Sequence, residues 1–280
     1  MAVTIRTMGG FGNQAFMYAF SLALKALGNE VFIERSWFEH QPQRAWVLDR
    51  FNTDCQFGPI RGQCLQEGNL RFRPEFLKKY DQDVTLIGYW QNIGYLAGVE
   101  EQVRKDLTLR HYPSNKSLAV ANQIHNTNSV FLHVRRTDSL SASGLKNHGV
   151  CPQSYYQRAA SYISTRVKDP HFFIFSDDIE WCKQNIKVFG YPATFVDHNS
   201  TGVTESPEHE VRKTDSGTEH EDLFLMSRCK HAITANSSFS WWGAWLQQNP
   251  EKIIVSPKQW FVPGSPHDGS EIVPASWTRL

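Results

Sequence analysis

The sequence predicts an α/β fold built as two lobes with a cleft between them. Strand-like runs of apolar residues alternate with segments in which apolar residues recur at helical spacing, a pattern typical of parallel sheets covered by helices. The alternation is irregular up to residue 116 and clean afterwards, so we expect an N-terminal lobe over residues 1–116 and a C-terminal lobe over 117–280. A chain of 280 residues, 40% of them hydrophobic, is long enough to fill two cores.

The composition excludes several classes of protein. A net charge of +1 provides no global field for nucleic acid or an anionic membrane, so any basic site must be local. The five cysteines form no CxxC pair, which argues against a zinc knuckle and a disulfide framework. No signal-peptide pattern and no run of about 18 apolar residues occurs. For a bacterial source we expect a cytoplasmic protein without stable membrane insertion; peripheral contact with the inner membrane stays open.

A strand, a glycine-rich turn and a helix open the chain. The pattern predicts the strand over residues 3–7, the turn over 8–14, and a helix over 15–27 that Gly28 closes. Backbone amides at such a helix start can meet an anion or a sugar hydroxyl. The spacing is not the GxGxxG fingerprint, and the need for glycine in a tight connection explains the turn better when it is taken alone.

The rest of the first lobe is less regular. Residues 98–107 predict a helix, residues 36–79 indicate variable loops with short helices, and a predicted helix over 117–123 opens the second lobe. Residues 31–34 and 84–87 predict strands. The second of these strands leads into residues 88–92, Gly-Tyr-Trp-Gln-Asn, an aromatic and amide cluster suited to a strand end that faces a cleft. Asp81-Gln82-Asp83 matches the DxD pattern that can hold a divalent metal. Because this segment precedes a strand, we favour a solvated turn and predict no metal site.

The second lobe is organised around residues 131–138, Phe-Leu-His-Val-Arg-Arg-Thr-Asp. This is the pattern of a buried strand with a charged cluster at its end. The adjacent guanidinium groups of Arg135 and Arg136 repel each other unless an anion lies beside them, and a carboxylate or a diphosphate fits two planar forks. The stretch therefore indicates an anion site. The alternative, in which one arginine pairs with a local acid such as Asp138 and the other is solvated, fits these eight residues equally well.

Further elements follow this stretch. A polar loop over residues 139–147 is a candidate mobile cover for a ligand. The pattern then predicts a helix over 154–167, a strand over 172–175, a helix over 179–185, a strand over 194–196, a polar insertion over 198–218, a helix over 219–226, strands over 232–235 and 253–256 on either side of an aromatic helix that begins near Ser238, and a turn-rich tail after Trp260.

Polar side chains follow three strands of the predicted second sheet. The three pairs are Arg135 with Arg136, Asp177 with Asp178, and Ser237 with Ser238. Parallel strands place their carboxyl ends at one edge of the sheet, where open α/β sheets bind ligands. Guanidinium groups and a hydroxyl-rich helix start neutralise a diphosphate, and a carboxylate can accept the N1 and N2 hydrogens of guanine, although helix capping alone would explain one aspartate. The combination predicts a site for a purine nucleoside diphosphate.

Five segments, taken together, carry a family resemblance. They are GGFGNQ at 9–14, HVRRTD at 133–138, HGVC at 148–151, FIFSDDIEWC at 173–182, and CKH at 229–231 running into NSSFSWWGAWL at 236–246. In this order, and over nearly the full chain, they resemble the bacterial α-1,2-fucosyltransferases of glycosyltransferase family 11. The resemblance implies a GT-B-like fold of two Rossmann-type lobes, inverting transfer of L-fucose from GDP-fucose to O2 of a terminal galactose, and no metal or other cofactor.

The resemblance also implies partners and residue roles. The first lobe would take a galactose-terminated acceptor glycan, lactose-like or of O-antigen type, and the second lobe would bind GDP-fucose. Arg135 and Arg136 would bind the diphosphate and assist catalysis. The other donor-binding residues implied are His133 at the donor, Asp177 or Asp178 at the guanine, Asn236, Ser237, Ser238 and Phe239 around the β-phosphate, and Gly10, Gly12 and Asn13 in the glycine-rich turn, where Asn13 would reach the fucose or the acceptor.

Asp138 is the candidate general base, because it lies nearest in sequence to the diphosphate site. Orientation of Arg136 or closure of the following loop would explain it equally well, and His148 and Glu221 are weaker candidates. Thr137 and the insertion at 201–218 depart from the family pattern. Two alternative functions stay open: a transferase with another linkage or nucleotide-sugar donor, and a non-catalytic glycan-binding protein. The sequence specifies neither the preferred acceptor nor the oligomeric state.

Overall fold

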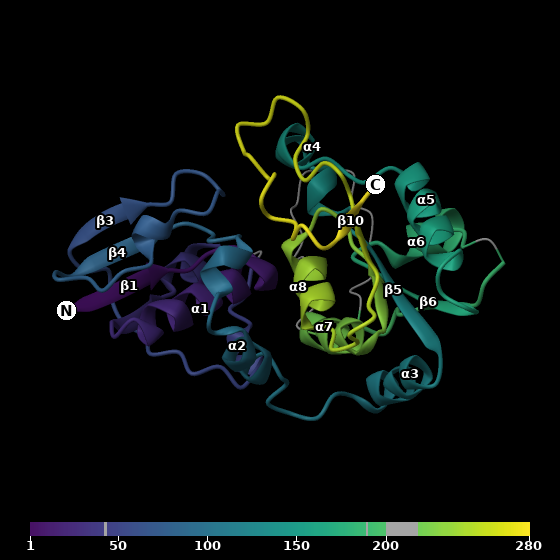
Figure 1. Cartoon of the computed structure of the whole chain (residues 1–280), viewed down its shortest axis with the longest axis horizontal. Coiled ribbons are helices and arrows are strands. Elements are labelled where there is room, and N and C mark those ends of the chain that lie inside the picture. Colours follow the sequence, from purple (N-terminus) through teal and green to yellow (C-terminus); the bar gives the residue numbers. More distant parts are fainter. Residues whose placement is uncertain (42–43, 189, 200–217) are drawn as a thin grey trace. The chain divides into compact units, whose positions relative to one another are not determined.

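The computed structural model describes residues 1–41, 44–188, 190–199 and 218–280. The predicted α/β class is confirmed, because the described chain divides into two compact units that each contain a parallel sheet (Figure 1). Unit 1 comprises Met1–His111 and His267–Pro274, and unit 2 comprises Tyr112–Pro266 and Ala275–Leu280. The first break in the chain thus falls after His111 rather than after residue 116, and a C-terminal segment belongs to the first unit.

Side-chain hydrogen bonds attach the segment His267–Pro274 to the rest of unit 1. Arg71 Nε donates to Asp268 Oδ2 at 2.7 Å, although 197 residues separate the two positions. Glu271 Oε2 accepts from the backbone N–H of Phe72 at 2.8 Å and from Asn92 Nδ2 at 3.0 Å. Local periodicity carries no information about such distant partners, so the sequence alone could not group this segment with unit 1.

Unit 1 contains a four-stranded parallel sheet in the order β2-β1-β4-β3. Its strands are β1 Ala2–Arg6, β2 Glu30–Glu34, β3 Gln63–Gln66 and β4 Val84–Ile87. Its helices are α1 Phe11–Ala26 and α2 Glu100–Asp106, with the short 3₁₀ helices η1 Ser36–His40, η2 Leu48–Arg50, η3 Pro74–Phe76 and η4 Ile93–Leu96. Because β2 lies on one side of β1 and β4 on the other, the strand order reverses between β1 and β4.

The glycine-rich turn sets the start of α1. Gly9 adopts a φ of +80°, and a Cβ at this position would lie 2.4 Å from Asn13 Nδ2, so only glycine fits. Gly10 then forms the N-cap in an extended conformation, and its carbonyl accepts from the backbone N–H groups of Asn13 and Gln14. As a result α1 begins at Phe11 rather than at residue 15.

Strand β3 lies inside the range that the sequence assigns to loops. Its burial pattern is exposed at three of four residues, as suits the edge of a sheet, and apolar alternation is therefore missing. Backbone pairing with β4 positions the strand, with Cys64 opposite Thr85 and Gln66 opposite Ile87. The loop prediction is wrong here because backbone hydrogen bonds, rather than side-chain burial, define this strand.

Unit 2 contains a six-stranded parallel sheet in the order β10-β9-β8-β5-β6-β7. Its strands are β5 Asn128–Val134, β6 Pro170–Ser176, β7 Ala193–Phe195, β8 His231–Ile233, β9 Ile254–Ser256 and β10 Thr278–Arg279. Its helices are α3 Asn115–His125, α4 Ala142–Asn147, α5 Gln153–Ser164, α6 Ile179–Asn185, α7 Glu219–Arg228 and α8 Ser238–Leu246, with the 3₁₀ helix η5 Asp138–Leu140.

Helices cover both faces of this sheet (Figure 1). On one face, Val130, Leu132 and Val134 of β5 pack in a buried cluster with apolar residues of α5 and α6. The intervening residue His133 points to the other face, where its ring lies 5.7 Å from the ring of Phe239 in α8. A strand buried on both faces carries consecutive apolar residues, here at 130–132, which is why this strand was recognisable without alternation.

One prediction for unit 2 is wrong. The polar loop expected over residues 139–147 is largely helical, because Ser141 accepts a hydrogen bond from the N–H of Gly144 at 3.0 Å and caps α4. The tail after Trp260 is turn-rich as predicted, and it ends in β10, a strand of two residues that pairs with β9. The predicted insertion over 198–218 falls almost entirely on residues 200–217, which lie outside the described part of the structure.

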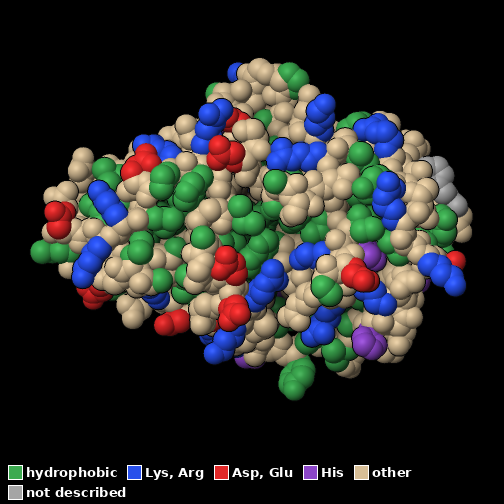
Figure 2. All heavy atoms as spheres, viewed as in Figure 1, with side chains coloured by type: hydrophobic (Ala, Val, Ile, Leu, Met, Phe, Trp, Pro, Cys, Tyr) green, Lys and Arg blue, Asp and Glu red, His purple; other side chains and the backbone are tan. Residues whose placement is uncertain are grey.

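The surface carries interspersed charges. On the face drawn in Figure 2, basic and acidic side chains are both scattered over the surface, with Lys and Arg side chains the more frequent on the right of the view. This distribution agrees with the net charge of +1. Within the described ranges, no helix combines the length and the apolar character that a membrane span requires.

Candidate active site

The strand order of unit 2 reverses at β5. Strands β6 and β7 lie on one side of β5, and β8, β9 and β10 lie on the other. In parallel sheets of this order, ligands bind in the crevice between the carboxyl ends of the two strands that flank the reversal, here β5 and β8. Arg135 follows the last residue of β5, and Ser237 follows β8 as the N-cap of α8.

The side chain of Arg135 reaches the N-terminus of α8. Its Nη1 atom lies 3.5 Å from Ser237 Oγ, and Arg135 is half-buried while Ser237 is buried. The exposed N–H groups of a helix start carry a partial positive charge, so a guanidinium group beside them adds charge of the same sign. An anion placed between the two relieves this repulsion, and the geometry fits the predicted diphosphate site.

The second arginine is oriented differently. Arg136 Nε donates to Asp178 Oδ2 at 3.0 Å, and the guanidinium carbon lies 3.8 Å from the centre of the Trp181 ring. Asp178 also accepts from the backbone N–H of Trp181 at 3.2 Å and so caps α6. One arginine of the pair therefore does pair with a nearby acid, but this acid is Asp178 and comes from the next strand end.

Asp177 connects the ends of β5 and β6. Its Oδ1 accepts from the backbone N–H of Arg136 at 2.8 Å, and its Oδ2 accepts from the N–H and the Oγ1 hydroxyl of Thr137 at 3.1 and 2.6 Å. Both oxygens therefore bind this chain's own backbone and hydroxyl groups. Guanine recognition by Asp177 or Asp178 stays a prediction. It requires a carboxylate oxygen that can accept a further hydrogen bond from the guanine ring in addition to those from the protein.

His133 is the penultimate residue of β5, two positions before Arg135, and is 5% exposed. Burial, with a smaller contribution from the charge of Arg135, lowers the pKa of His133 to about 3, so the imidazole is neutral at physiological pH. Its Nδ1 atom has no hydrogen-bond partner among the described residues. A buried unpaired ring nitrogen is costly, and a polar group of a ligand at the strand end would satisfy it.

The segment that begins α8 has two kinds of role. Asn236 Nδ2 donates to the carbonyl oxygens of His148 at 2.8 Å and Trp260 at 3.2 Å, so this amide holds neighbouring backbone segments in place. Ser240 Oγ accepts from the backbone N–H of Ala235 at 3.2 Å. Ser238 and Phe239 remain partly exposed at the helix start. Of the predicted set, Asn236 therefore acts on the loop backbone, and the helix start remains the element suited to a phosphate.

Asp138, the predicted base, begins the 3₁₀ turn η5 directly after Thr137. Its side chain lies outside the described part of the structure, so its role as a base stays a prediction. Two other groups at this edge, Thr137 and Trp181, were not assigned a function from sequence. Trp181 could have been found by its position one helical turn after Asp178, which places both on the same side of α6.

The remaining predicted residues, Gly10, Gly12 and Asn13, lie in unit 1 at the carboxyl end of β1. Asn13 Oδ1 accepts from Gln91 Nε2 at 2.7 Å, and Gln91 belongs to the cluster that follows β4. Gly10 is the N-cap of α1 and Gly12 is buried in its first turn. The structure thus joins the two polar strand ends of unit 1 at the point where its strand order reverses.

A buried carboxyl group lies beside this pair. Glu67 follows β3 and is 3% exposed, and its Oε2 atom accepts from the backbone N–H groups of Tyr89 at 2.7 Å and Trp90 at 3.1 Å. Burial raises the pKa of Glu67 to about 7, against the lowering effect of the two N–H groups and the charge of Arg73. The sequence analysis missed this residue, because one glutamate among irregular loops gives no signal of burial.

Replacing Glu67 with glutamine is expected to stabilise the protein at alkaline pH. A folded-state pKa above the unfolded value means that the folded state binds the proton more tightly, so stability falls as pH rises from about 4.5 to about 7 and stays reduced above that range. The shift corresponds to about 3 kcal/mol at full ionisation. Glu67→Gln should therefore raise the midpoint of thermal unfolding at about pH 8.5 and leave it nearly unchanged at about pH 5. Equal changes in the thermal midpoint at both pH values would show that ionisation of Glu67 is not the cause of the stabilisation.

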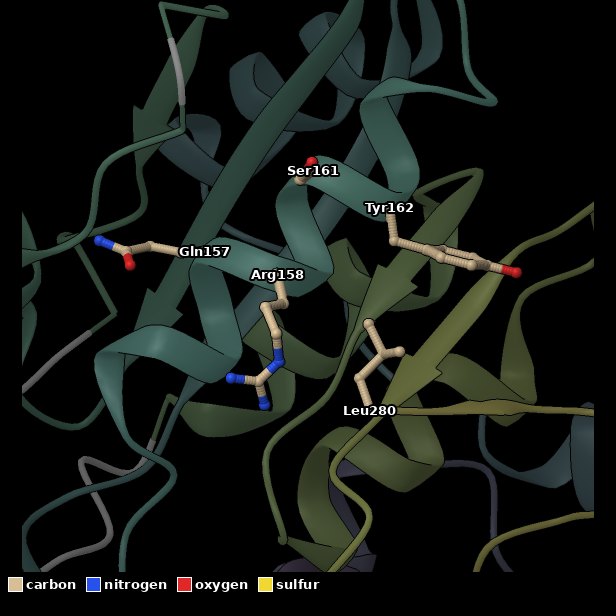
Figure 3. Close-up of a pocket in the computed structure, with 5 residues that line it drawn as sticks. All are labelled: Gln157, Arg158, Ser161, Tyr162 and Leu280. Carbon is tan, nitrogen blue, oxygen red and sulfur yellow. The ribbon is translucent and has the colours of Figure 1, made fainter.

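A shallow pocket lies elsewhere on unit 2. It has a volume of about 420 Å³ and is lined by Gln157, Arg158, Ser161 and Tyr162 of α5 together with the C-terminal Leu280 (Figure 3). None of the predicted site residues lines it. In the described ranges, no group of three or more His, Cys, Asp or Glu side chains could hold a metal ion, and Asp83 of the DxD segment accepts from the backbone N–H of Ala2 at 2.8 Å.

The fold of the chain, with two parallel sheets covered by helices, is of the GT-B-like class. A structure of an Arabidopsis thaliana FUT1 mutant in complex with GDP superposes on this chain with a TM-score of 0.51, over 99% of this chain and 76% of that one. At 12% identity this similarity shows the fold alone. The similarity in fold agrees with the two Rossmann-type units described above, each of which is built on a parallel sheet.

The chain belongs to glycosyltransferase family 11, whose family model matches residues 77–265. An α-1,2-colitosyltransferase of Escherichia coli is 31% identical over 99% of this chain and 98% of its own length. The O-antigen biosynthesis glycosyltransferase WbnK of Escherichia coli is 32% identical over 97% of this chain and 98% of its own length. The human galactoside α-(1,2)-fucosyltransferase 1 is 26% identical over 87% of this chain and 65% of its own length.

Proposed function

We propose that this glycosyltransferase moves L-fucose from GDP-fucose to O2 of a terminal galactose, with inversion at the anomeric carbon. The observation that carries the proposal is the position of Arg135 against Ser237 at the switch point of unit 2, in a chain of family 11. This arrangement suits the diphosphate of a nucleotide sugar. A GDP-sugar donor is supported by relatives whose names describe α-1,2-fucosyl transfer.

The proposed reaction is a single displacement. The acceptor hydroxyl attacks the anomeric carbon of fucose while the bond from this carbon to the β-phosphate oxygen breaks, and GDP leaves with the electron pair. Arg135 and the N–H groups at the start of α8 stabilise the charge that develops on the departing diphosphate. A cationic clamp of this kind can act without a metal. The hydroxyl proton passes to a base, for which we propose Asp138.

His133 and Arg136 support this arrangement in different ways. We propose that the neutral imidazole of His133 forms a hydrogen bond to the donor, which satisfies its buried Nδ1 atom. Arg136, bound to Asp178 and stacked on Trp181, positions the strand end from which Arg135 projects. We therefore expect the two adjacent arginines to contribute unequally to donor binding.

A second candidate donor is GDP-colitose, because a relative 31% identical over 99% of this chain is an α-1,2-colitosyltransferase. Colitose is fucose without its 3-hydroxyl group, so an enzyme that hydrogen-bonds this hydroxyl discriminates strongly against colitose. Incubation with each GDP-sugar and a panel of galactosides in the presence of EDTA, followed by NMR of the product, tests the proposal. Transfer to O3 or O4, a strict metal requirement, or a preference for GDP-colitose would overturn it.

Calorimetry provides a prediction that is independent of turnover. If the site recognises guanine, GDP is expected to bind at least about tenfold more tightly than UDP, which presents a smaller base without the N2 donor. Equal affinities would mean that the site reads only the diphosphate. In that case the donor assignment would fail even if the diphosphate site is correct. We further propose a cytoplasmic enzyme whose acceptor is a lactose-like or O-antigen-type glycan. The O-antigen alternative is supported by a relative named as an O-antigen biosynthesis glycosyltransferase.

A further inference from the structure

The structure assigns Glu67 as a positioning residue that holds the turn after β4 so that Gln91 and Asn13 form a binding site for the acceptor sugar in unit 1. This inference rests on the proposed function, since it takes a galactoside as the acceptor. Its physical basis is the contacts that fix the turn over residues 88–90, the hydrogen bond between Gln91 and Asn13, and the position of this pair at the carboxyl ends of β1 and β4.

The turn after β4 is built around the carboxyl group of Glu67. Oε2 accepts two consecutive backbone N–H groups, those of Tyr89 and Trp90. Gly88 leaves room for this approach, because a Cβ there would lie 2.4 Å from Glu67 Cβ and 2.6 Å from Oε2. The side chain of residue 67 thus determines the path of the chain through residues 88–90.

The turn is conformationally costly. Trp90 adopts a φ of +55°, in the left-handed region that a residue with a bulky side chain rarely occupies. Two kinds of contact compensate: the N–H bond to Glu67, and burial of an indole that stacks on Phe20 at 4.2 Å and meets Tyr95 edge-on at 5.6 Å. Without the carboxyl group, the backbone N–H of Trp90 loses its hydrogen bond to Glu67, while the indole ring keeps its contacts with Phe20 and Tyr95.

The consequence falls on the next residue, Gln91. Its amide donates to Asn13 Oδ1 at 2.7 Å, and Gln91 itself is 6% exposed. On the other side, Asn13 is fixed in the first turn of α1, since its N–H donates to the Gly10 carbonyl at 3.0 Å. Both partners are therefore held by backbone geometry, one through the glycine-rich turn and one through Glu67.

The amide pair lies where a ligand is expected. It joins the carboxyl ends of β1 and β4, between which the strand order of unit 1 reverses. Amide side chains donate and accept at fixed angles, which suits the vicinal hydroxyl groups of a pyranoside. Tyr89, which is exposed in the same turn, supplies an aromatic face that sugars stack on.

Kinetics with lactose as the acceptor test the assignment. Glu67→Ala is expected to raise the KM for lactose at least about tenfold and to leave the KM for GDP-fucose within about twofold, because the groups proposed to bind the diphosphate and the guanine lie in unit 2. Glu67→Gln keeps an oxygen that accepts both N–H groups, so it should restore the lactose KM to near the wild-type value. The exposed Glu101→Ala on α2 serves as the matched control and should change neither constant.

A second variant keeps the inference testable if Glu67→Ala does not fold. Gln91→Ala removes only the amide, and it should raise the lactose KM to a similar extent without lowering the thermal midpoint. Gln66→Ala, on the exposed edge strand, is the control and should leave the lactose KM unchanged. Unchanged lactose KM in Glu67→Ala and Gln91→Ala, or an equal rise in the donor KM, would overturn the inference. Absence of transfer by the wild-type protein would instead reject the proposed function.

Discussion

Replacing Arg135 with alanine is expected to lower kcat/KM for GDP-fucose by about 10²- to 10³-fold while the fold is retained. This magnitude is typical for removal of one donor that stabilises a developing anion. Arg135→Lys should recover only part of the loss, because an ammonium group keeps the charge but lacks the planar fork that fits a diphosphate. Steady-state kinetics and calorimetry with GDP, together with circular dichroism of each variant, measure this result.

Arg166→Ala is the matched control for Arg135. Arg166 belongs to the same unit, and its guanidinium carbon lies 3.6 Å from the centre of the Tyr162 ring, away from the switch point. Its loss should leave kcat/KM within about twofold, as expected of an exposed cation–π contact. If both alanine variants lost activity equally, general destabilisation would explain the effect and Arg135 would have no special role.

Replacing Asp177 with alanine is expected to cost both stability and activity. Its carboxylate accepts from two backbone N–H groups and one hydroxyl, at Arg136 and Thr137, and so connects the end of β5 to the end of β6. Losing these charge-assisted bonds should lower the free energy of unfolding by about 2 to 4 kcal/mol. The end of β5 would then be released, and kcat/KM should fall by about 10²-fold because Arg135 projects from it.

The asparagine variant separates the hydrogen-bonding capacity of the side chain from its shape. Asp177→Asn has nearly the same shape, but its NH₂ group would face an N–H or O–H donor at one of the two positions, so it should not rescue the protein. Glu180→Ala is the control, since this carboxylate is exposed and pairs with Lys183 at 2.8 Å near the same strand end. Wild-type stability of Asp177→Asn would show that the network is not needed.

The amino-acid sequence carried enough information to predict which polar residues follow the strand ends of unit 2. The run at 130–132 is apolar without alternation because β5 is buried on both faces, and Arg135 follows the end of that strand. The same reasoning placed the Asp177 and Ser237 positions at parallel strand ends. What sequence could not resolve is orientation: Arg135 and Arg136 are adjacent, yet one reaches α8 and the other reaches α6.

Elements without a local signal were the ones missed. Strand β3 is polar and lies at an edge, so only its backbone pairing with β4 defines it. The segment 267–274 belongs to unit 1 through hydrogen bonds to residues far away in sequence. Glu67 looks like a surface residue in a loop until the turn at 88–91 closes over it.

The sequence by itself determined the fold class, most of the strands and helices, and the charged strand ends of unit 2, because each of these depends on local periodicity or on a short motif. Only the tertiary structure decided which partner each charged group has, where the β3 edge lies, and that a buried carboxyl group shapes the turn beside Asn13. These features depend on contacts between residues distant along the chain, where the free energy of burial and hydrogen bonding is set by packing that no local pattern encodes.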